Sequence, residues 1–249
     1  MTAPFEPYTL VLHEGANPRT GGVAVCGFTN AGMVGVISTS HIIRALNLEQ
    51  QGTVLNENFP AVALVQDEIP KHPVRIYQGD GIGVFTSEIK FEDDKDISLA
   101  TTVLEWFIKG GFDKLYVIDG IISQDKDMME SMLYGVGSSP STRAALKEIG
   151  IETIRSGVVS GITGFLLGEG DRLGLEITAL LSEASPIYPD ARSAAIAVEA
   201  LSELTGMEIP LGELLENARV IEESVREMFD KQTSNVLPQP KVGDDPSFG

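Results

Sequence analysis

Short runs rich in valine and isoleucine alternate with amphipathic helical segments along most of the chain. This alternation is typical of an α/β domain, in which helices cover a central sheet. Between residues 53 and 87 the β-like runs follow one another through links of hairpin length, which are too short for the crossover that parallel neighbours need. The sequence therefore predicts an α/β three-layer sandwich with a mixed central sheet.

The expected elements are bounded by ordinary start and stop signals. Asp96 and Asp190 are placed to cap helices, Pro140 and Pro210 to begin them, and glycines to end them. Strands are predicted over residues 8–12, 22–27, 53–56, 61–66, 74–78, 82–87, 115–118, 152–159 and 175–181. Helices are predicted over residues 32–46, 96–110, 140–149, 161–173 and 190–205, and from residue 210 onward.

The composition changes at residue 233. From there the chain is mostly proline, glycine and polar residues, and Val236, Leu237, Val242 and Phe248 are its sizeable apolar side chains. Such a peptide cannot bury enough surface to fold alone. We therefore expect a single α/β domain over residues 1–232 and a C-terminal tail over residues 233–249.

Charge excludes whole classes of partner. The chain has 36 acidic and 18 basic residues, so its formal net charge is −18. Such a surface repels phosphate backbones and anionic lipids, and we expect neither nucleic acid nor membrane as a partner. The chain shows no apolar run of membrane-spanning length and no signal peptide, and Cys26 is its single cysteine. A cytoplasmic location is expected.

Two glycine-rich segments join predicted strands to helices. The first contains Gly27, Asn30, Gly32 and Gly35, and its spacing does not match the dinucleotide-binding fingerprint. Its glycines fit two interpretations, either tight packing of a helix on the sheet or contact with an anion or other ligand at the helix N-terminus. Both stay open.

The second segment contains Gly157, Gly161 and Gly164 and leaves the same two interpretations open. Loops of this kind at strand ends can face one cleft in an open α/β sheet.

Catalytic and metal motifs are missing from the sequence. There is no G-x-S-x-G nucleophile motif, and none of the three histidines pairs with another at metal-ligand spacing. His41 lies in an apolar helix and is expected to be a core or interface residue. The acidic runs at 93–96 and 125–127 are expected to be solvated loops. No catalytic residue, metal site or cofactor is predicted.

An ordered series of motifs resembles the proteasome-assembly-chaperone family of archaea, which is related to the second subunit of the eukaryotic heterodimeric chaperone. The resemblance covers about residues 8–230 and implies a phosphorylase/hydrolase-like fold, no known enzymatic activity, homo-oligomers, and binding to proteasome α subunits. The motifs lie at residues 27–35, 67–77, 104–106, 118–121, 157–167 and 188–195.

The apolar helices predicted over 32–46 and 161–173 also favour a homo-oligomer, because one side of a sheet does not cover all their apolar surface.

The family resemblance extends to the chain end with a departure. Family members often end in a hydrophobic residue, a tyrosine and one further residue, whereas this chain has Ser247, Phe248 and Gly249. Phe248 keeps the penultimate aromatic ring but lacks the hydroxyl. Phe248 and Gly249 are therefore predicted to bind the partner.

Three alternatives to a chaperone remain on the same fold: a nucleoside-phosphorylase-like enzyme, a hydrolase-like enzyme, and a small-ligand-binding protein. An enzyme would be favoured if Gly32, Gly161, Asp119 and an arginine such as Arg75 or Arg155 met in one pocket.

Overall fold

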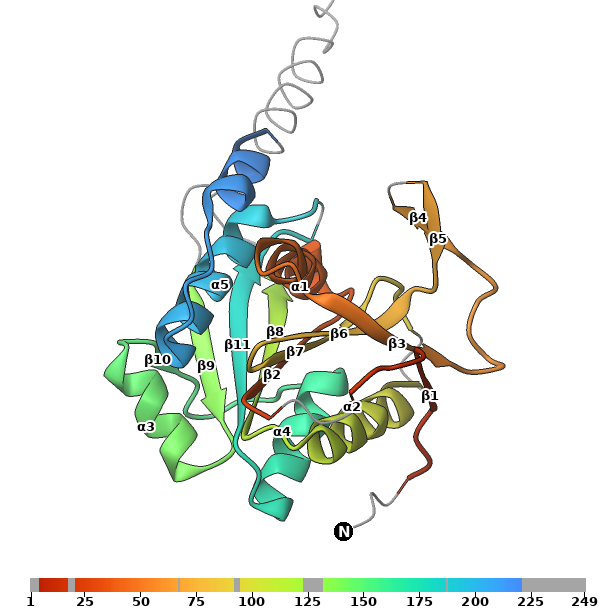
Figure 1. Cartoon of the computed structure of the whole chain (residues 1–249). Coiled ribbons are helices and arrows are strands. Elements are labelled where there is room, and N and C mark those ends of the chain that lie inside the picture. The colour runs from red at the N-terminus through yellow and green to blue at the C-terminus, as the bar shows by residue number, and fades with distance from the viewer. Residues whose placement is uncertain are drawn as a thin grey trace, which may run out of the picture.

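The computed structural model describes residues 5–17, 21–66, 68–91, 95–122, 132–186 and 188–220. Within these ranges one large mixed sheet has the strand order β1-β3-β6-β7-β2-β8-β11-β9-β10 (Figure 1). Its strands are β1 (Thr9–Leu12), β2 (Val23–Gly27), β3 (Glu49–Leu55), β6 (Val74–Gly79), β7 (Ile82–Ser87), β8 (Lys114–Ile122), β9 (Leu133–Gly137), β10 (Glu152–Thr153) and β11 (Ile177–Ala184). A separate hairpin pairs β4 (Leu64–Gln66) with β5 (Ile69–Lys71).

The helices are α1 (Val34–Ala45), preceded by the 3-10 turn η1 (Ala31–Met33), α2 (Asp96–Gly110), α3 (Pro140–Glu148), α4 (Gly161–Leu173) and α5 (Ala191–Thr205). Residues 212–220 are also helical. No helix in the described part of the chain is long and apolar enough to cross a membrane.

The sheet is mixed, as predicted. β6 runs antiparallel to both β3 and β7, whereas β2 lies parallel between β7 and β8, and β8 is parallel to β11. The short link between β6 and β7 therefore produces antiparallel neighbours, whereas the parallel strands β9 and β10 are joined by a longer crossover that contains α3. The sheet turns antiparallel again where β11 pairs with β9.

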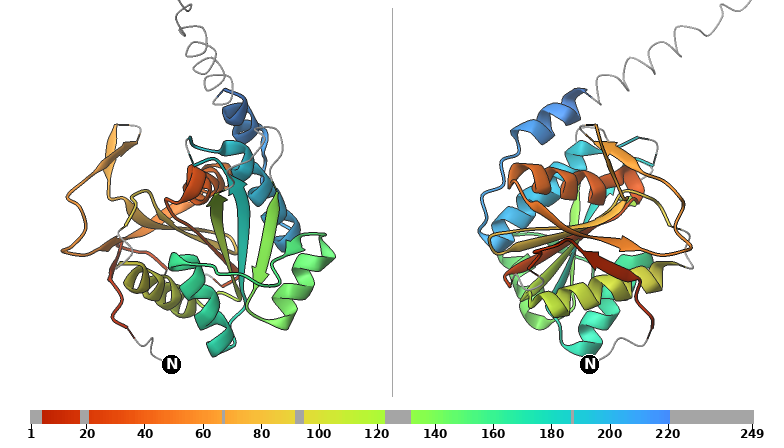
Figure 2. Two further views of the ribbon diagram at one scale, coloured as in Figure 1. Left: turned by 180° about the vertical axis from the view of Figure 1, so that it is seen from behind. Right: turned by 45° about the vertical axis from the view of Figure 1, so that its right-hand side comes forward.

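Helices cover both faces of the sheet, which confirms the three-layer architecture (Figures 1 and 2). Successive residues of β8 show the division: Leu115 and Val117 pack in the same cluster as α2 and α4, whereas Tyr116 and Ile118 pack with α1 and α5. This alternation is the two-residue period of a strand buried on both sides. The phosphorylase/hydrolase-like label stays a prediction.

Several predicted boundaries are wrong. The strand expected over 152–159 ends at Thr153, β3 begins at Glu49 rather than at residue 53, and β5 and β9 were not predicted. Asp96 is the first residue of α2 and does not cap it, because the cap position belongs to Lys95. Asp190, by contrast, caps α5 as expected, and its carboxylate accepts a hydrogen bond from the Ser193 backbone N–H at 3.0 Å.

Candidate functional site

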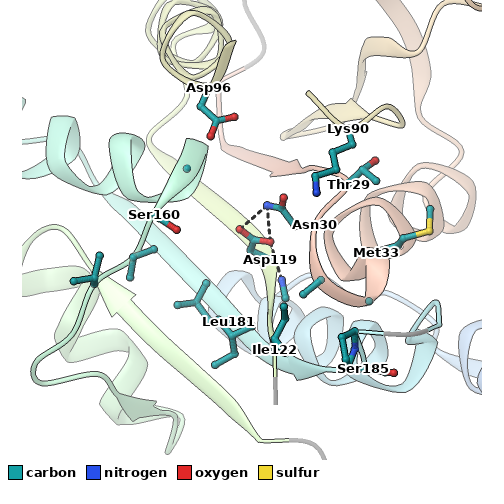
Figure 3. Close-up of a pocket in the computed structure, with 18 of the residues that line it drawn as sticks. Thr29, Asn30, Met33, Lys90, Asp96, Asp119, Ile122, Ser160, Leu181 and Ser185 are labelled. Carbon is teal, nitrogen blue, oxygen red and sulfur yellow. Dashed lines mark hydrogen bonds between the residues drawn. The ribbon is translucent and has the colours of Figure 1, made fainter. Parts of the chain in front are cut away.

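A cleft of about 1160 Å³ opens at the carboxyl ends of the central strands (Figure 3). Its walls come from the loop after β2, the first residues of α2 and α4, the end of β8 and the segment before α5. Ligands of open α/β sheets bind outside the carboxyl ends of the strands, so this cleft is where a small-molecule site would be expected. Residues of both glycine-rich segments contribute to its lining.

The glycines of the first segment have steric reasons. A Cβ on Gly27 would lie 2.2 Å from the Gly35 carbonyl oxygen, and a Cβ on Gly35 would lie 2.6 Å from the Ile118 oxygen. α1 therefore approaches β2 and β8 more closely than any side chain would allow. Gly32 lines the cleft with a φ of +59°, and its carbonyl accepts a hydrogen bond from Asp190 N at 2.7 Å.

The second segment is also shaped by backbone constraints. Gly161 begins α4 with a φ of +68°, a conformation that favours glycine. A Cβ on Gly164 would lie 2.2 Å from the Val159 carbonyl oxygen, whereas one on Gly157 would meet only a side-chain atom of Ile154 at 3.6 Å. Backbone conformation thus accounts for Gly161 and close packing for Gly164, and neither gives a comparable reason for Gly157.

Asp119 is the buried polar centre of the cleft. One carboxylate oxygen accepts hydrogen bonds from Asn30 Nδ2 at 3.0 Å and from the Gly120 backbone N–H at 2.8 Å. The other accepts from Asn30 Nδ2 at 3.1 Å, a contact that Figure 3 draws, and from Thr163 Oγ1 at 2.6 Å. The carboxylate therefore ties the loop after β2 to α4 across the end of β8.

Burial raises the pKa of Asp119, and its hydrogen bonds from Thr163, Asn30 and Gly120 partly oppose that rise. These donors are all neutral, and no ion pair to Asp119 is found in the described ranges. Each oxygen already accepts two hydrogen bonds, which leaves the carboxylate little capacity for general acid or base chemistry. The network is best explained as a structural tie.

The rest of the cleft is mainly apolar at its rim. Ile122 and Val158 have exposed fractions of 63% and 94%, respectively, and Lys90 is the one basic residue among the described residues that line the cleft. Figure 3 shows Lys90 and Asp96 directed toward the same space as Asn30. Among the residues that the structure describes, no group of three or more histidine, cysteine, aspartate or glutamate side chains could hold a metal ion.

Cys26 and His41 are not among the residues that line the cleft. Cys26 is fully buried in β2, and burial, followed by the charge of Asp119, raises the pKa of its thiol well above the usual value. His41 is buried as predicted, and its Nε2 lies 2.7 Å from the Pro210 carbonyl oxygen. That contact joins α1 to the segment that leads into the last described helix.

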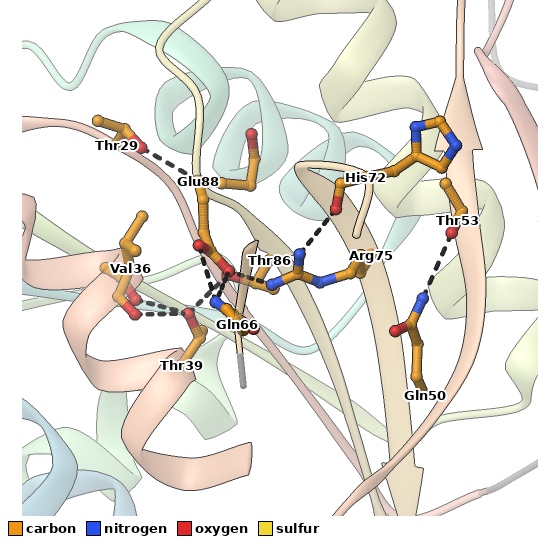
Figure 4. Close-up of polar contacts among 12 residues, drawn as sticks. Thr29, Val36, Thr39, Gln50, Thr53, Gln66, His72, Arg75, Thr86 and Glu88 are labelled. Atoms are coloured by element: carbon orange, nitrogen blue, oxygen red, sulfur yellow. Dashed lines mark hydrogen bonds and ion pairs between the residues drawn. The ribbon is translucent and has the colours of Figure 1, made fainter. Parts of the chain in front are cut away.

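The arginine of the enzyme alternative lies elsewhere. Gly32, Gly161 and Asp119 do line one cleft, but neither Arg75 nor Arg155 is among the residues that line it. Arg75 is buried and forms an ion pair with Glu88, and its NH1 donates to the His72 carbonyl oxygen at 2.7 Å (Figure 4). The set of residues that would have favoured an enzyme therefore lacks its arginine.

Sequence reasoning missed Thr163 and Glu88 as partners in these networks, and Lys90 as a residue that lines the cleft. Thr163 was visible inside the second glycine-rich segment, where a hydroxyl two residues into a helix can reach a neighbouring strand. The acidic runs were only partly placed: residues 92–94 and 123–131 lie outside the described ranges, as do Phe248 and Gly249.

Comparison with known proteins gives the chain a family. A family model described as the PAC2 family matches residues 24–229. A protein of Methanocaldococcus jannaschii described as uncharacterized is 27% identical over 209 residues, which is 84% of this chain and 86% of that protein.

Solved structures agree with this match. The crystal structure of Pyrococcus furiosus PbaA, described as an archaeal homologue of proteasome-assembly chaperone, has a TM-score of 0.80 and 27% identity, over 92% of this chain and 94% of that one. P. furiosus PbaB, described as an archaeal proteasome activator, shares the fold with a TM-score of 0.76 and 19% identity, over 90% and 100% of the two chains. The chain belongs to the PAC2 family.

Proposed function

We propose that this protein is a non-enzymatic, proteasome-assembly-chaperone-like protein that self-associates and binds proteasome α subunits. The observation that carries the proposal is the likeness to PbaA, which extends over 92% of this chain at 27% identity. The cleft also supports the proposal, because its buried carboxylate already accepts hydrogen bonds from structural donors and no arginine is among the described residues that line it.

The proposed contact with the α subunits is the segment at Phe248–Gly249. An aromatic side chain that enters a pocket, beside a charge-assisted contact from a carboxylate, is an efficient anchor for a peptide. Composition supports this role, because residues 233–249 contain too little apolar surface to form a core of their own.

The test is a pull-down of the organism's own proteasome α subunits with the full-length protein and three variants. Deleting residues 247–249 and substituting Phe248→Ala should each weaken binding at least several-fold, whereas Ser247→Ala, the matched neighbour, should not. All three variants should keep the wild-type fold and oligomeric mass. Retention of α subunits by the truncated protein at the wild-type level would reject the docking role. If the full-length chain binds no α subunit, the chaperone proposal itself fails.

A further inference from the structure

A groove of about 310 Å³ lies between the edge strand β1 and helix α2 (Figures 1 and 2). The described residues that line it are all different from those that line the cleft at the strand ends. Its volume falls at the lower end of the range found for pockets that bind small molecules. The groove is therefore a second cavity, separate from the candidate site, and large enough for a small ligand.

The walls of the groove are mainly apolar. Tyr8, Leu10 and Leu12 alternate along the extended chain at β1 and so share one face, and Trp106 contributes to the wall from α2. The ring of Tyr8 packs against that of Phe59 with a centroid distance of 4.9 Å, which holds this end of the wall in place. A pocket whose walls are already fixed loses little conformational freedom when a ligand enters.

A glycine in the sheet leaves room for the groove. Gly52 of β3 is paired with Leu12 on one side and with Ile76 on the other, and both of these neighbours line the groove. Residues directly opposite one another in antiparallel strands face the same side of the sheet. A Cβ on Gly52 would lie 3.2 Å from Leu12 Cδ2, so this position faces the groove and contributes no side chain to fill it.

Several polar side chains of the groove are already paired. Glu105 and Lys109 form an ion pair at 2.5 Å, so their charges cancel locally in a chain whose net charge is −18. Thr102 Oγ1 donates to the Ser98 carbonyl oxygen at 2.7 Å and accepts from the Tyr8 backbone N–H at 2.8 Å. These groups favour a neutral ligand over a charged one and require no further partner.

Two other buried polar groups of the lining have no partner. Gln78 is 8% exposed, and its side-chain amide forms no hydrogen bond within the described part of the chain. Trp106 is 4% exposed, and its Nε1–H likewise has no acceptor. Buried polar groups of folded proteins are almost always hydrogen-bonded, and each exception calls for an explanation. Two exceptions in the lining of one cavity point to a ligand that binds there.

The two groups define the chemistry of that ligand. The indole N–H of Trp106 only donates, whereas the amide of Gln78 both donates and accepts. A carbonyl oxygen has two lone pairs and can accept from both side chains, and an N–H on the adjacent atom can donate to Gln78 Oε1. A carboxamide carries this acceptor and this donor together. A carboxylate lacks the donor, and a hydrocarbon lacks both.

We propose that the groove between β1 and α2 binds a small neutral carboxamide with an apolar body. Its amide pairs with Gln78 and Trp106, and its apolar body lies against Leu10 and Ile76. The site is separate from the contact proposed for the α subunits, and neither proposal depends on the other.

The first experiment uses benzamide as the probe and follows Trp106 by NMR. Trp106 is the chain's single tryptophan, so the full-length ¹⁵N-labelled protein gives one indole N–H signal. Benzamide should shift this signal saturably, with a dissociation constant of about 1 mM or lower. Toluene has the same ring without the amide and should bind at least several-fold more weakly. A signal that does not shift saturably, or equal affinities for the two probes, would overturn the proposal.

The second experiment removes the amide of the protein. Gln78→Leu should weaken benzamide binding at least several-fold and leave toluene binding unchanged or stronger. Its thermal unfolding should match or exceed that of the wild type, because the amide has no partner in the fold. Gln50→Leu is the matched control. It makes the same change on the neighbouring strand opposite Tyr77, which packs on the other face of the sheet, and should keep the wild-type affinity.

The third experiment fills the groove and does not depend on the behaviour of the Gln78 variant. Leu10→Phe adds volume at a half-buried position of the wall and should abolish the binding of both benzamide and toluene. Unchanged benzamide affinity in either Gln78→Leu or Leu10→Phe would place the amide site elsewhere and overturn the proposal. The pull-down of α subunits is read separately, so its result does not affect this test.

Discussion

Removing the carboxylate of Asp119 should destabilise the fold, because the lost hydrogen bonds outweigh the gain from removing a buried charge. Asp119→Ala leaves the Thr163 hydroxyl, which is 1% exposed, and the Gly120 N–H without their acceptor. Each orphaned buried donor costs about 1–3 kcal/mol. Asn30 is exposed and can turn to water, and removing a buried charge returns part of the loss. We expect a decrease of about 2–3 kcal/mol in the free energy of unfolding.

Asp119→Asn should be much milder, because its amide oxygen can accept from Asn30 and Gly120 while its NH₂ donates to Thr163 Oγ1. The two proteins should also differ in pH dependence. The folded pKa of Asp119 is raised above its ordinary value of 3.8, so the folded wild type binds more protons than the unfolded chain between those two pKa values. The free energy of unfolding of the wild type therefore falls as pH rises from the ordinary pKa through the folded pKa. Asp119→Asn does not titrate at this position, so its stability relative to the wild type should increase from acid to neutral pH.

Urea unfolding at one fixed protein concentration, followed by circular dichroism at several pH values, measures both effects. Thr163→Val serves as the matched control, since it removes one donor and leaves the carboxylate. If Asp119→Ala were as stable as the wild type or more stable, the carboxylate would be held in the cleft at a cost, and the structural explanation would be refuted.

Three further changes test packing, pairing and capping by the same unfolding assay. Gly35→Ala should cost several kcal/mol, because its Cβ would lie 2.6 Å from a backbone oxygen, whereas Gly212→Ala, with nothing within 4 Å, should not destabilise. Arg75→Met leaves the Glu88 carboxylate without its ion-pair partner and should lower the free energy of unfolding by about 3–5 kcal/mol. A decrease below about 1 kcal/mol would contradict burial of the pair. Asp190→Ala should cost about 1–2 kcal/mol as a lost cap of α5, with no change in α-subunit retention.

Local signals predicted the helices well. α4 begins and ends where expected because Gly161 and Gly174 both adopt positive φ, which marks the two ends by a backbone requirement visible in the sequence. α5 was placed for a related reason, between its capping Asp190 and Gly206. Such signals depend on a few neighbouring residues, so no tertiary information was needed.

Strands were harder because their propensity reflects packing rather than backbone preference. The segment 154–159 resembles a strand in composition, yet Ile154, Val158 and Val159 line the cleft instead of joining the sheet. β9 was invisible for the opposite reason, since it contains Gly135 and Gly137, where a Cβ would strike α3. These glycines are needed because α3 packs closely on β9, and that tertiary contact cannot be read from the local sequence.

The candidate site depended on contacts that no local pattern encodes. Asp119 was recognisable at the end of a strand, but Asn30 and Thr163 lie 89 and 44 residues from it in the chain. Residues 61–66 were likewise predicted as one strand, whereas β4 begins only at Leu64 and pairs with β5 outside the main sheet.

The position of β2 in the sheet has a consequence for how the chain is made. β2 lies in the middle, and its register pairs Val23 with Ile82 on one side and with Lys114 on the other. During synthesis, both edges of this apolar strand therefore stay open until β7 and then β8 have emerged, and β8 in turn waits for β11. Such long-range parallel pairing is slow and leaves strand edges available to other chains. We therefore expect a nascent or truncated chain that ends before Lys114 to aggregate, and a protein of this architecture to depend on chaperones during its own folding.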